Sequence, residues 1–495
     1  MGKVYVLGFH NWWNKINAVK EDILNQKLAL VQSSSSSSTT STDQQQHHQQ
    51  NPPLLRLGIL SAAAINYTAI WDPVSTHPDV VITGLAARDK ARAEAQIASN
   101  KRFLPRECKA YGSYTALLDA DDVDAVYIAA PNGLHHKWAL EALARGKHVL
   151  VEKPIASNAR QARDLRDAAA AATARYARRI VLLEAFHWRF HPSVHVVKQL
   201  LLDGQYGRVL GVDARAILPG GVLGTDDIRF QYRLGGGCCM DLTYVFSAIA
   251  YFAARDVADP NLEFEVVDAN ARLNRSDPLV DEAVEATIRI RDPNPYPRPK
   301  TAASESPNDG KLPLPAEITA TLTADLAQPK LFGLIPKLWA VGAPTVTIQC
   351  EHAEIVFENF MGPWTTHKIS VVPVTRDPAT NEIVKRGAGQ SGVSGVKSAT
   401  LKQFKGGPLW DRELTPTTAG GGSSGGGGGG QEWWTTYRWQ LEAFVRMIRD
   451  GQDDSGTTHY KGPWVDVAES IRVMEMIDST YEKLGLPLRG VEGDG

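Results

Sequence analysis

The sequence predicts an α/β protein in which a doubly wound domain with a parallel sheet precedes an α+β domain with a mostly antiparallel sheet. Over the first third of the chain, short apolar runs alternate with helical segments at the spacing of βαβ units, which form parallel sheets covered on both faces. After about Phe186, strand-like runs follow one another without helices between them. The 495 residues fit two such domains, at roughly 150 residues per domain, once low-complexity tracts are set aside.

The first domain is expected to contain five buried strands. Each is a short apolar run bounded by small or turn-forming residues, as strands buried on both faces require. Helical segments rich in alanine and charged residues separate them, and Gly146 is a typical helix stop. The expected strands are 54–60, 80–86, 125–130, 148–151 and 180–184; the expected helices are a segment ending at 71, then 88–98, 114–120, 135–145 and 158–176.

The second domain is expected to be a sheet with one buried and one solvated face. Thr287-Ile-Arg-Ile-Arg291 alternates apolar and charged residues, which is the period of such a strand. The other expected strands are 209–216, 285–291, 317–324, 346–350 and 354–358, and the expected helices are 192–203, 437–450 and 464–484.

Residues 1–53 are expected to be a disordered extension. Although 19–31 could form a short amphipathic helix, a serine run and a Gln/His tract follow it, and such tracts stay solvated. An alternative is that this extension binds a partner. We expect the dinucleotide-binding domain over 54–186 and the substrate domain over 187–490, with flexible insertions rich in Pro, Gly, Ser or Thr at about 293–315, 376–399 and 415–431.

Composition and charge exclude several classes of function. With 53 basic and 55 acidic residues, the net charge is −2, so we expect neither nucleic acid nor anionic membrane lipid as a partner. Four cysteines without a C-x-x-C pair indicate reduced thiols rather than a disulfide framework or a zinc ribbon. No run of eighteen apolar residues and no secretory signal are present, so we expect a cytoplasmic protein.

The turn after the first strand is the expected site of a dinucleotide. Ligands of doubly wound sheets bind at the carboxyl ends of the strands, and the turn Gly58–Asn66 lies at the first of them. A G-x-G-x-x-G fingerprint would place glycines where this chain has Ser61, Ala63 and Asn66, so the motif is degenerate. Small side chains still allow a pyrophosphate to approach the backbone, against Ser61, Ala63 and Ile65. The alternative is a turn that binds no ligand.

The end of the second strand favours NADP as the cofactor. A dehydrogenase selective for NAD usually has an Asp or Glu here to bind the ribose 2′-hydroxyl. This chain has Ala86-Ala-Arg-Asp89, with no acid before Arg88. A guanidinium at this position can bind a 2′-phosphate and stack on the adenine. The alternative is that Arg88 only begins a solvated helix.

The most specific pattern combines APNGLHH (residues 130–136) with GKHVLVEKPIA (146–156). This pattern resembles the Gfo/Idh/MocA family of oxidoreductases, and within it the branch of NADP-dependent D-xylose 1-dehydrogenases and dimeric dihydrodiol dehydrogenases, particularly its fungal-type members. The resemblance covers about residues 54–489 apart from the insertions, and further matching segments are 184–192, 204–209, 234–241, 437–444 and 474–486.

The resemblance implies the catalytic lysine and its surroundings. The Glu-Lys-Pro motif of the family carries that lysine, which is Lys153 here. A lysine near the nicotinamide stabilises developing alkoxide charge and lowers the pKa of a neighbouring phenol. Glu152 is expected to orient the lysine or the nicotinamide ribose, and Asn132 and His135 are expected to line the same cofactor crevice. A solvated surface lysine is the alternative for Lys153.

The acid/base partner is expected to follow the Gly-Gly-Gly…Asp segment. In this branch a tyrosine commonly lies four residues after the aspartate, but here Tyr244 lies three residues after Asp241. One residue is a turn of about 100° on a helix. Either the helix begins differently and Tyr244 still faces the nicotinamide, or another group transfers the proton. Asp241 is expected to contact a substrate hydroxyl or the lysine, with a helix cap as its alternative.

Substrate and metal binding are less directly encoded. Arg189 and Arg229 are candidate substrate residues by the resemblance, with an interdomain ion pair as the alternative for both. His187 and His191 are four residues apart and suggest a metal site. We expect no metal, because the sequence provides no third ligand, Pro192 disturbs a helix there, and the family transfers hydride without one.

Together these features predict an NADP-dependent oxidoreductase acting on a sugar or a cyclic diol. By the resemblance, the leading candidate is oxidation of D-xylose at C1 to the 1,5-lactone. The alternatives are a trans-1,2-dihydrodiol dehydrogenase and a non-catalytic NADP-binding regulator with the same fold. A homodimer that pairs through the exposed face of the C-terminal sheet is also expected by the resemblance.

Overall fold

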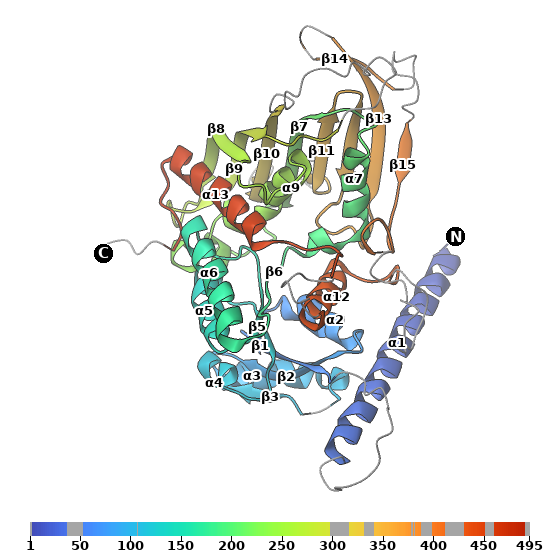
Figure 1. Cartoon of the computed structure of the whole chain (residues 1–495), viewed down its shortest axis with the longest axis vertical. Helices are drawn as coiled ribbons and strands as arrows, with labels where there is room; N and C mark the ends of the chain where they lie inside the picture. Colours follow the sequence, from blue (N-terminus) through green and yellow to red (C-terminus); the bar gives the residue numbers. More distant parts are fainter. Residues whose placement is uncertain are drawn as a thin grey trace.

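A computed structural model describes residues 2–36, 53–105, 107–297, 316–330, 341–377, 380, 382–387, 398–410, 430–450 and 460–490. Two sheets organise these residues, one in each half of the chain, and helices pack between them (Figure 1). One continuous cluster of buried apolar residues extends through both halves. The expected pairing of a Rossmann-like domain with a mostly antiparallel second domain is confirmed.

The N-terminal domain is a six-stranded parallel sheet with the order β3-β2-β1-β4-β5-β6. The order reverses between β1 and β4, and doubly wound sheets bind ligands in the crevice outside the carboxyl ends at such a point. We did not predict β3 from the sequence, because this strand is only three residues long. The strands are β1 (Leu55–Leu60), β2 (Val80–Ala86), β3 (Lys109–Tyr111), β4 (Ala125–Ile128), β5 (His148–Val151) and β6 (Leu182–Glu184).

Local sequence signals explain where the helices of this domain begin and end. The side chains of Asp89 and Asn158 accept hydrogen bonds from the first turns of α3 and α6, which satisfies free amides there. Gly146 adopts a φ of +67° after α5, a conformation that glycine adopts without strain. The helices are η1 (Tyr67–Trp71), α2 (Asp72–Ser75), α3 (Lys90–Ser99), η2 (Lys101–Phe103), α4 (Tyr114–Leu118), η3 (Asn132–Leu134), α5 (His135–Ala144) and α6 (Ala159–Tyr176).

The second domain is a nine-stranded sheet with the order β14-β13-β12-β11-β7-β10-β9-β8, and β15 pairs with β13. Only β10 and β7 pair in parallel, whereas the other neighbours are antiparallel. The strands are β7 (Val209–Pro219), β8 (Glu263–Leu273), β9 (Asp281–Asp292), β10 (Ala316–Gln328), β11 (Thr345–Cys350), β12 (Ala353–Glu358), β13 (Lys368–Arg376), β14 (Ile383–Arg386) and β15 (Ala399–Leu401).

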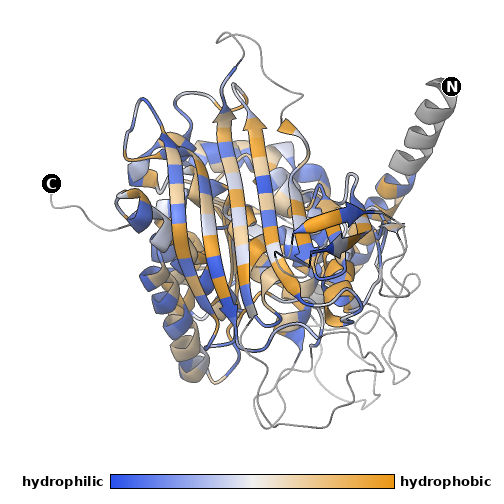
Figure 2. Cartoon of the chain, turned by 90° about the horizontal axis from the view of Figure 1, so that it is seen from above, coloured by the Kyte–Doolittle hydropathy of each residue, from blue (hydrophilic) through white to orange (hydrophobic). Residues whose placement is uncertain are grey.

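The alternation expected in β9 is confirmed. Ile288 and Ile290 are fully buried, whereas Arg289 and Arg291 form ion pairs with glutamates of the neighbouring strands on the outer face. Figure 2 shows hydrophilic and hydrophobic residues interleaved along these strands. Pairing of two copies through this face stays a prediction.

Helices cover the inner face of this sheet and join it to the first domain. Helix α9 contacts β7 and β10, α13 contacts β8 and also α6 of the first domain, and α12 contacts η4 and α2 (Figure 1). The helices are η4 (His187–Phe190), α7 (Pro192–Leu202), η5 (Ile228–Phe230), η6 (Tyr232–Leu234), α8 (Cys238–Asp241), α9 (Thr243–Ala253), α12 (Thr436–Arg449) and α13 (Val467–Leu484).

Residues 2–36 of the N-terminal extension are helical, which differs from the disorder we expected for residues 1–53. Helix α1 (Gly2–Ser36) lies beside the first domain and contacts α2 (Figure 1). Ile16, Ile23 and Lys27 are buried on one face of it, at helical spacing. The Lys27 ammonium donates to the Val74 carbonyl at 2.7 Å, and Lys20 pairs with Asp72 at 2.6 Å. Residues 37–52 lie outside the described part of the chain.

The expected insertions fall mostly on residues that the structure does not describe, namely 298–315, 378–379, 381, 388–397 and 411–429. Within the second insertion, strand β14 is described. All four cysteines are described by the structure; each is buried and in no disulfide. Among the described residues no single helix is long and apolar enough to cross a membrane; a bent pair, Tyr232–Asp241 with Thr243–Ala253, meets the length and composition test.

Candidate active site

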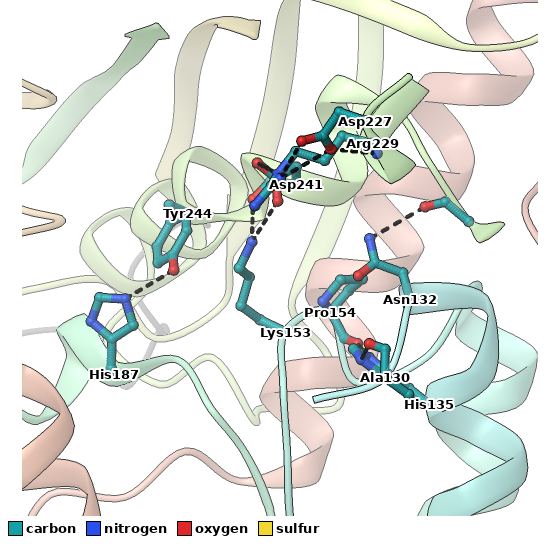
Figure 3. A network of polar contacts seen from close by, with 11 residues as sticks. Ala130, Asn132, His135, Lys153, Pro154, His187, Asp227, Arg229, Asp241 and Tyr244 are labelled. Atoms are coloured by element: carbon teal, nitrogen blue, oxygen red, sulfur yellow. Dashed lines mark hydrogen bonds and ion pairs between the residues drawn. The ribbon is translucent and has the colours of Figure 1, made fainter. Parts of the chain in front are cut away.

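The site is centred on Lys153, which follows the carboxyl end of β5. Its side chain is only 12% exposed, so the solvated surface lysine considered as an alternative is excluded. The ammonium donates to the backbone carbonyl of Asp241 at 2.7 Å and to Oδ1 of the same residue at 3.0 Å (Figure 3). An ion pair between the two domains therefore fixes the position of this cation.

Asp241 is held by two cations. Its Oδ2 lies 3.1 Å from Nε of Arg229, whose Nη1 also pairs with Asp227 (Figure 3). Burial alone would raise the pKa of Asp241, but Lys153 and Arg229 outweigh it and hold that pKa below its usual value. Asp241 is the last residue of α8 and not a helix N-cap, so the cap alternative is excluded. Of the two candidate substrate arginines, the structure brings Arg229 to the site.

Tyr244 also lies beside Lys153 despite its displaced position in the motif. Leu242, with φ −91° and ψ 33°, separates α8 from α9, so the aspartate and the tyrosine are on two helical segments. The Lys153 ammonium lies 5.0 Å from the centre of the Tyr244 ring. The break between the helices thus compensates for the one-residue shift, which favours the first of the two alternatives.

The expected lowering of the phenol pKa is not seen. Burial raises the pKa of Tyr244 well above its ordinary value, and Tyr437, Glu152 and Asp241 raise it further, while Arg229 opposes them. The hydroxyl points away from Lys153 and lies 2.9 Å from Nε2 of His187 (Figure 3). Tyr244 is therefore a protonated phenol at neutral pH, suited to donate a proton.

Glu152 lies between the first domain's core and the lysine. Its Oε1 accepts a hydrogen bond of 2.7 Å from the hydroxyl of Tyr127, a fully buried residue of β4. Burial raises the pKa of Glu152, although Lys153 and the Tyr127 hydroxyl oppose this. The carboxylate is thus fixed at the strand ends beside Lys153, where the sequence places it.

The turn after β1 has the backbone of a dinucleotide-binding turn although it lacks the glycines. Ser61 adopts a φ of +89°, in the left-handed region that a fingerprint glycine would occupy, and its amide donates to Ala86 at 2.9 Å. The side chain of Asn66 donates to the Ser61 carbonyl at 2.8 Å. In the described structure the amides of residues 62–64 donate to no backbone carbonyl, so they are available to an anion.

The remaining expected cofactor residues differ in their placement. Ala63 is partly buried and Ile65 is 38% exposed, both on this turn. Arg88 is exposed and follows the end of β2 by two residues. Asn132 lies at the end of β4 and its amide donates to the Gly235 carbonyl at 3.3 Å, across the domain junction (Figure 3).

The expectation that His135 lines the crevice is wrong. Its ring is fully buried, with Nδ1 2.7 Å from the Pro154 carbonyl and Nε2 2.8 Å from the Ala130 carbonyl (Figure 3). Burial lowers the pKa of His135 to about 4. The imidazole ties the end of β4 to the turn that follows Lys153, so it supports the crevice from behind.

The expectation that Arg189 binds substrate is also wrong. Arg189 is 6% exposed, forms an ion pair of 2.8 Å with Glu469 of α13 and stacks on the Tyr251 ring at 3.6 Å. These partners hold the guanidinium in the interior of the second domain, so Arg189 forms a structural ion pair within one domain and not the interdomain ion pair considered as its alternative.

His187 and His191 do not face a common point. His187 contacts Tyr244 and Thr436, whereas Nδ1 of His191 lies 2.8 Å from the Ser193 hydroxyl. Over the described ranges, no group of three or more His, Cys, Asp or Glu side chains is arranged to hold a metal ion.

Three residues near Lys153 were not identified from sequence. Tyr127 supports Glu152, Thr436 contacts His187, and Tyr437 stacks 4.1 Å from the His187 ring. Tyr437 lies in a segment that matches the family, which is the one signal that could have found it. Tyr127 lies in a buried strand and Thr436 at a helix start, where their types are ordinary.

Comparison with known proteins finds a family model that matches most of the first domain. Residues 55–178 match the family model described as "Oxidoreductase family, NAD-binding Rossmann fold", that is, the Gfo/Idh/MocA family. This range contains the turn after β1, Arg88 and the Glu152–Lys153 pair.

Curated relatives are similar over about two fifths of the chain. A dTDP-3,4-didehydro-2,6-dideoxy-alpha-D-glucose 3-reductase from Streptomyces antibioticus is 37% identical over 41% of this chain and 58% of its own length. A D-xylose 1-dehydrogenase (NADP(+)) 2 from Haloferax volcanii is 38% identical over 40% and 57%, and a trans-1,2-dihydrobenzene-1,2-diol dehydrogenase from Xenopus laevis is 35% identical over 37% and 52%. The chain thus spans a little over half the length of these relatives.

Solved structures share the two-domain fold. A 3-ketoreductase from Actinomadura kijaniata in complex with NADP and TDP-benzene has a TM-score of 0.57 at 22% identity, covering 87% of this chain and 98% of that one. An aldose-aldose oxidoreductase from Caulobacter crescentus has a TM-score of 0.57 at 16% identity, covering 87% and 97%. Residues 55–178 therefore match the Gfo/Idh/MocA family model with its NAD-binding Rossmann fold, in agreement with the resemblance, and the two-domain fold is shared with these solved structures.

Proposed function

We propose that the protein is an NADP-dependent oxidoreductase that interconverts the hydroxyl and carbonyl forms of a sugar, with oxidation of D-xylose to D-xylono-1,5-lactone as the leading reaction. The observation that carries the proposal is the Lys153 ammonium, held at the domain junction by Asp241 at 3.0 Å and flanked by the Tyr244 ring. A cation after the carboxyl end of β5, with a carboxylate and a phenol of the second domain beside it, are the groups such a reaction requires.

The residues of the first domain fit NADP. The left-handed Ser61 and the free amides after it would hold the pyrophosphate, and Arg88 would hold the 2′-phosphate. When bound, the nicotinamide supplies the hydride acceptor or donor. Solved neighbours in complex with NADP and the NADP-dependent xylose dehydrogenase relative support this choice of cofactor.

Each side chain at the junction has a defined task in this proposal. Lys153 stabilises negative charge on the substrate oxygen, and Asp241 positions Lys153. Tyr244 transfers the proton between the substrate oxygen and the protein, and Arg229 contributes a second cation next to Asp241. Glu152 orients Lys153 or the ribose.

Reduction of a keto sugar at the same site is the second candidate function. Tyr244 is a protonated phenol at neutral pH, which favours proton donation to a carbonyl, and one relative is named as a 3-reductase of a nucleotide sugar. A trans-1,2-dihydrodiol dehydrogenase would use the same groups and is supported by the Xenopus laevis relative. A non-catalytic NADP-binding regulator is the alternative of a different class.

The test is turnover in both directions, followed by absorbance of the reduced nicotinamide. Purified protein is mixed with NADP and D-xylose, other aldoses or a trans-dihydrodiol, and with NADPH and keto sugars. We expect Lys153→Ala to lower kcat by about 10²–10⁴-fold while NADP affinity is kept, because only charge development in the reaction uses the ammonium. Lys137→Ala, at an exposed position on α5, is the matched control.

Arg88→Ala tests the cofactor assignment separately. We expect it to weaken NADP binding much more than NAD binding, because both carry the adenine but only NADP carries the 2′-phosphate. If the protein binds NADP but turns over none of the substrates tested, this result would contradict the enzyme proposal and favour the regulator. Equal loss of NADP and NAD binding would contradict the role of Arg88.

A further inference from the structure

The hydroxyl of Tyr244 is held from the side opposite to Lys153. The phenol oxygen lies 2.9 Å from Nε2 of His187, and Figure 3 shows it pointing toward that ring and away from the Lys153 ammonium. The ring itself is buried against Phe186 and His187 in edge-to-face contacts. The position of the hydroxyl is therefore set by its hydrogen-bond partner and not by the lysine.

His187 is itself fixed by a second hydroxyl. Its Nδ1 lies 2.8 Å from Oγ1 of Thr436, the first residue of α12, and its ring stacks 4.1 Å from Tyr437. His187 is 4% exposed and Thr436 is fully buried. The chain Tyr244–His187–Thr436 thus joins α9, η4 and α12 in the interior of the second domain.

The imidazole is neutral at physiological pH, which decides what it can do. Burial lowers the pKa of His187 to about 3, and the nearby Lys153 contributes to this. A neutral imidazole has one donor and one acceptor nitrogen, whereas the threonine hydroxyl can both donate and accept. With Thr436 as the partner of Nδ1, Nε2 can therefore accept from the Tyr244 phenol in one tautomer and donate to a phenolate in the other.

Two other buried histidines of this domain are not used in this way. His191 and His195 each have an Nε2 that makes no hydrogen bond with any described residue. His187 places both ring nitrogens on hydroxyl groups, and one of these hydroxyls belongs to the site. His367, also buried, engages both ring nitrogens as well, but with backbone groups, so the contact with the Tyr244 hydroxyl is what distinguishes His187.

We propose that His187, backed by Thr436, is the positioning residue for Tyr244: it fixes the phenol oxygen at the site and serves as its hydrogen-bond partner in both protonation states. The inference rests on the proposed function only in assigning proton transfer to Tyr244. The hydrogen-bond chain itself belongs to the protein without ligands, so it can be tested without turnover.

The first experiment measures the hydrogen bond in the free protein. In long-range ¹H–¹⁵N spectra of protein labelled at histidine, the signal lost in His187→Phe is that of His187, and its two nitrogen shifts report the tautomer. We expect Tyr244→Phe to move the Nε2 shift of His187, and Thr436→Val to move the Nδ1 shift. An unchanged Nε2 shift in Tyr244→Phe would overturn the proposal, whatever the activity of the enzyme.

The second experiment measures kcat in variants that keep one contact each. The glutamine amide of His187→Gln reaches the place of Nε2, whereas the shorter asparagine of His187→Asn reaches the place of Nδ1. We expect His187→Phe to lower kcat by about 3- to 10-fold, the effect of one hydrogen bond. His187→Gln should restore most of this loss, and His187→Asn should not.

A double variant separates positioning from general damage. If His187 acts through the phenol oxygen, His187→Phe in the Tyr244→Phe background causes no further loss of kcat. If His187→Phe lowers kcat in the Tyr244→Phe background by as much as it does in the wild type, the proposal is overturned. His195→Phe, a buried imidazole away from the site, is the control and should leave the Tyr244 contact unchanged. If the wild type shows no turnover, the proposed function is overturned. The spectroscopic experiment then still decides whether His187 is hydrogen-bonded to Tyr244.

Discussion

The two sides of the candidate site are built in different ways. On the first-domain side, Glu152 and Lys153 follow one strand, and the parallel sheet brings Asn132 and the turn after β1 to the same edge. On the second-domain side, groups from separate segments meet, among them Arg229 from η5 and Asp241 from the end of α8. Sheet topology positions the first set, whereas buried polar contacts position the second.

A buried ion pair stabilises the segment that carries Asp241 on the second-domain side. Arg489 and Asp281 are fully buried and 2.9 Å apart, and Arg489 donates to the Gly236 carbonyl at 2.7 Å. Asp281 accepts from the amide of Cys239 at 2.7 Å. These contacts fix the turn Gly235–Gly237 and the beginning of α8, the helix that ends at Asp241. The second-domain side therefore depends on a few charged groups whose removal should be costly.

The largest expected effect is that of removing this support. Arg489→Met leaves the Asp281 carboxylate buried without its cation, so we expect the free energy of unfolding to fall by about 3–5 kcal/mol, measured by urea denaturation. Arg291→Met breaks only exposed ion pairs and should change stability by less than about 1 kcal/mol. The double variant Asp281→Asn/Arg489→Met should recover part of the loss. If it recovers none, the unpaired charge is not the cause.

Glu184 lies at the border of the two sides and should make stability depend on pH. It ends β6, is 2% exposed and accepts from the Ile155 amide at 2.8 Å. Burial raises the pKa of Glu184 from its ordinary value of 4.5 to about 8, although Ser470 and the Ile155 amide oppose this. Because the folded state keeps a proton that the unfolded state releases, stability falls as pH rises from about 4.5 to about 8.

The matching variant is Glu184→Gln, which stays neutral at every pH. We expect it to be more stable than the wild type at pH 6, by up to about 1.4 kcal/mol per pH unit above the ordinary pKa, and equal to it at pH 4. Thermal unfolding across this range measures the difference. Glu263→Gln, at an exposed position, is the control. If the difference in stability between Glu184→Gln and the wild type does not increase with pH, Glu184 is ionised in the folded protein.

The same contrast explains what the sequence could predict. Lys153 and Asp241 were identified because they lie in motifs, and the strands of the first sheet because their apolar runs are continuous. Tyr244 was uncertain because the break at Leu242 cannot be inferred from spacing. Thr436 is 249 residues from His187, so no local pattern links them.

Two errors have the same origin in tertiary packing. Arg189 was expected to bind substrate because its segment resembles the family. Its side chain lies in a short helix, however, and points toward its ion-pair partner Glu469. Residues 1–53 were expected to be disordered from their composition, yet residues 2–36 form a helix in which Ile16, Ile23 and Lys27 are buried, and Lys27 donates to the Val74 carbonyl of the first domain. Composition describes a segment in isolation, whereas these contacts need the surface of α2.

The smallest expected effect is on the first-domain side, where the sheet supports the site independently of any single polar contact. Tyr127→Phe keeps the buried ring in β4 and removes only the hydroxyl that donates to Glu152 at 2.7 Å. Because that hydrogen bond opposes the raised pKa of Glu152, its loss should raise the pKa further. We expect NADP affinity to fall by about 3- to 10-fold, the effect of one hydrogen bond, with little change in melting temperature. Tyr114→Phe, at a tyrosine that packs on Trp138, is the control. A loss of stability as large as that of Arg489→Met would contradict the contrast between the two sides, because it would make the first-domain side equally dependent on one polar contact.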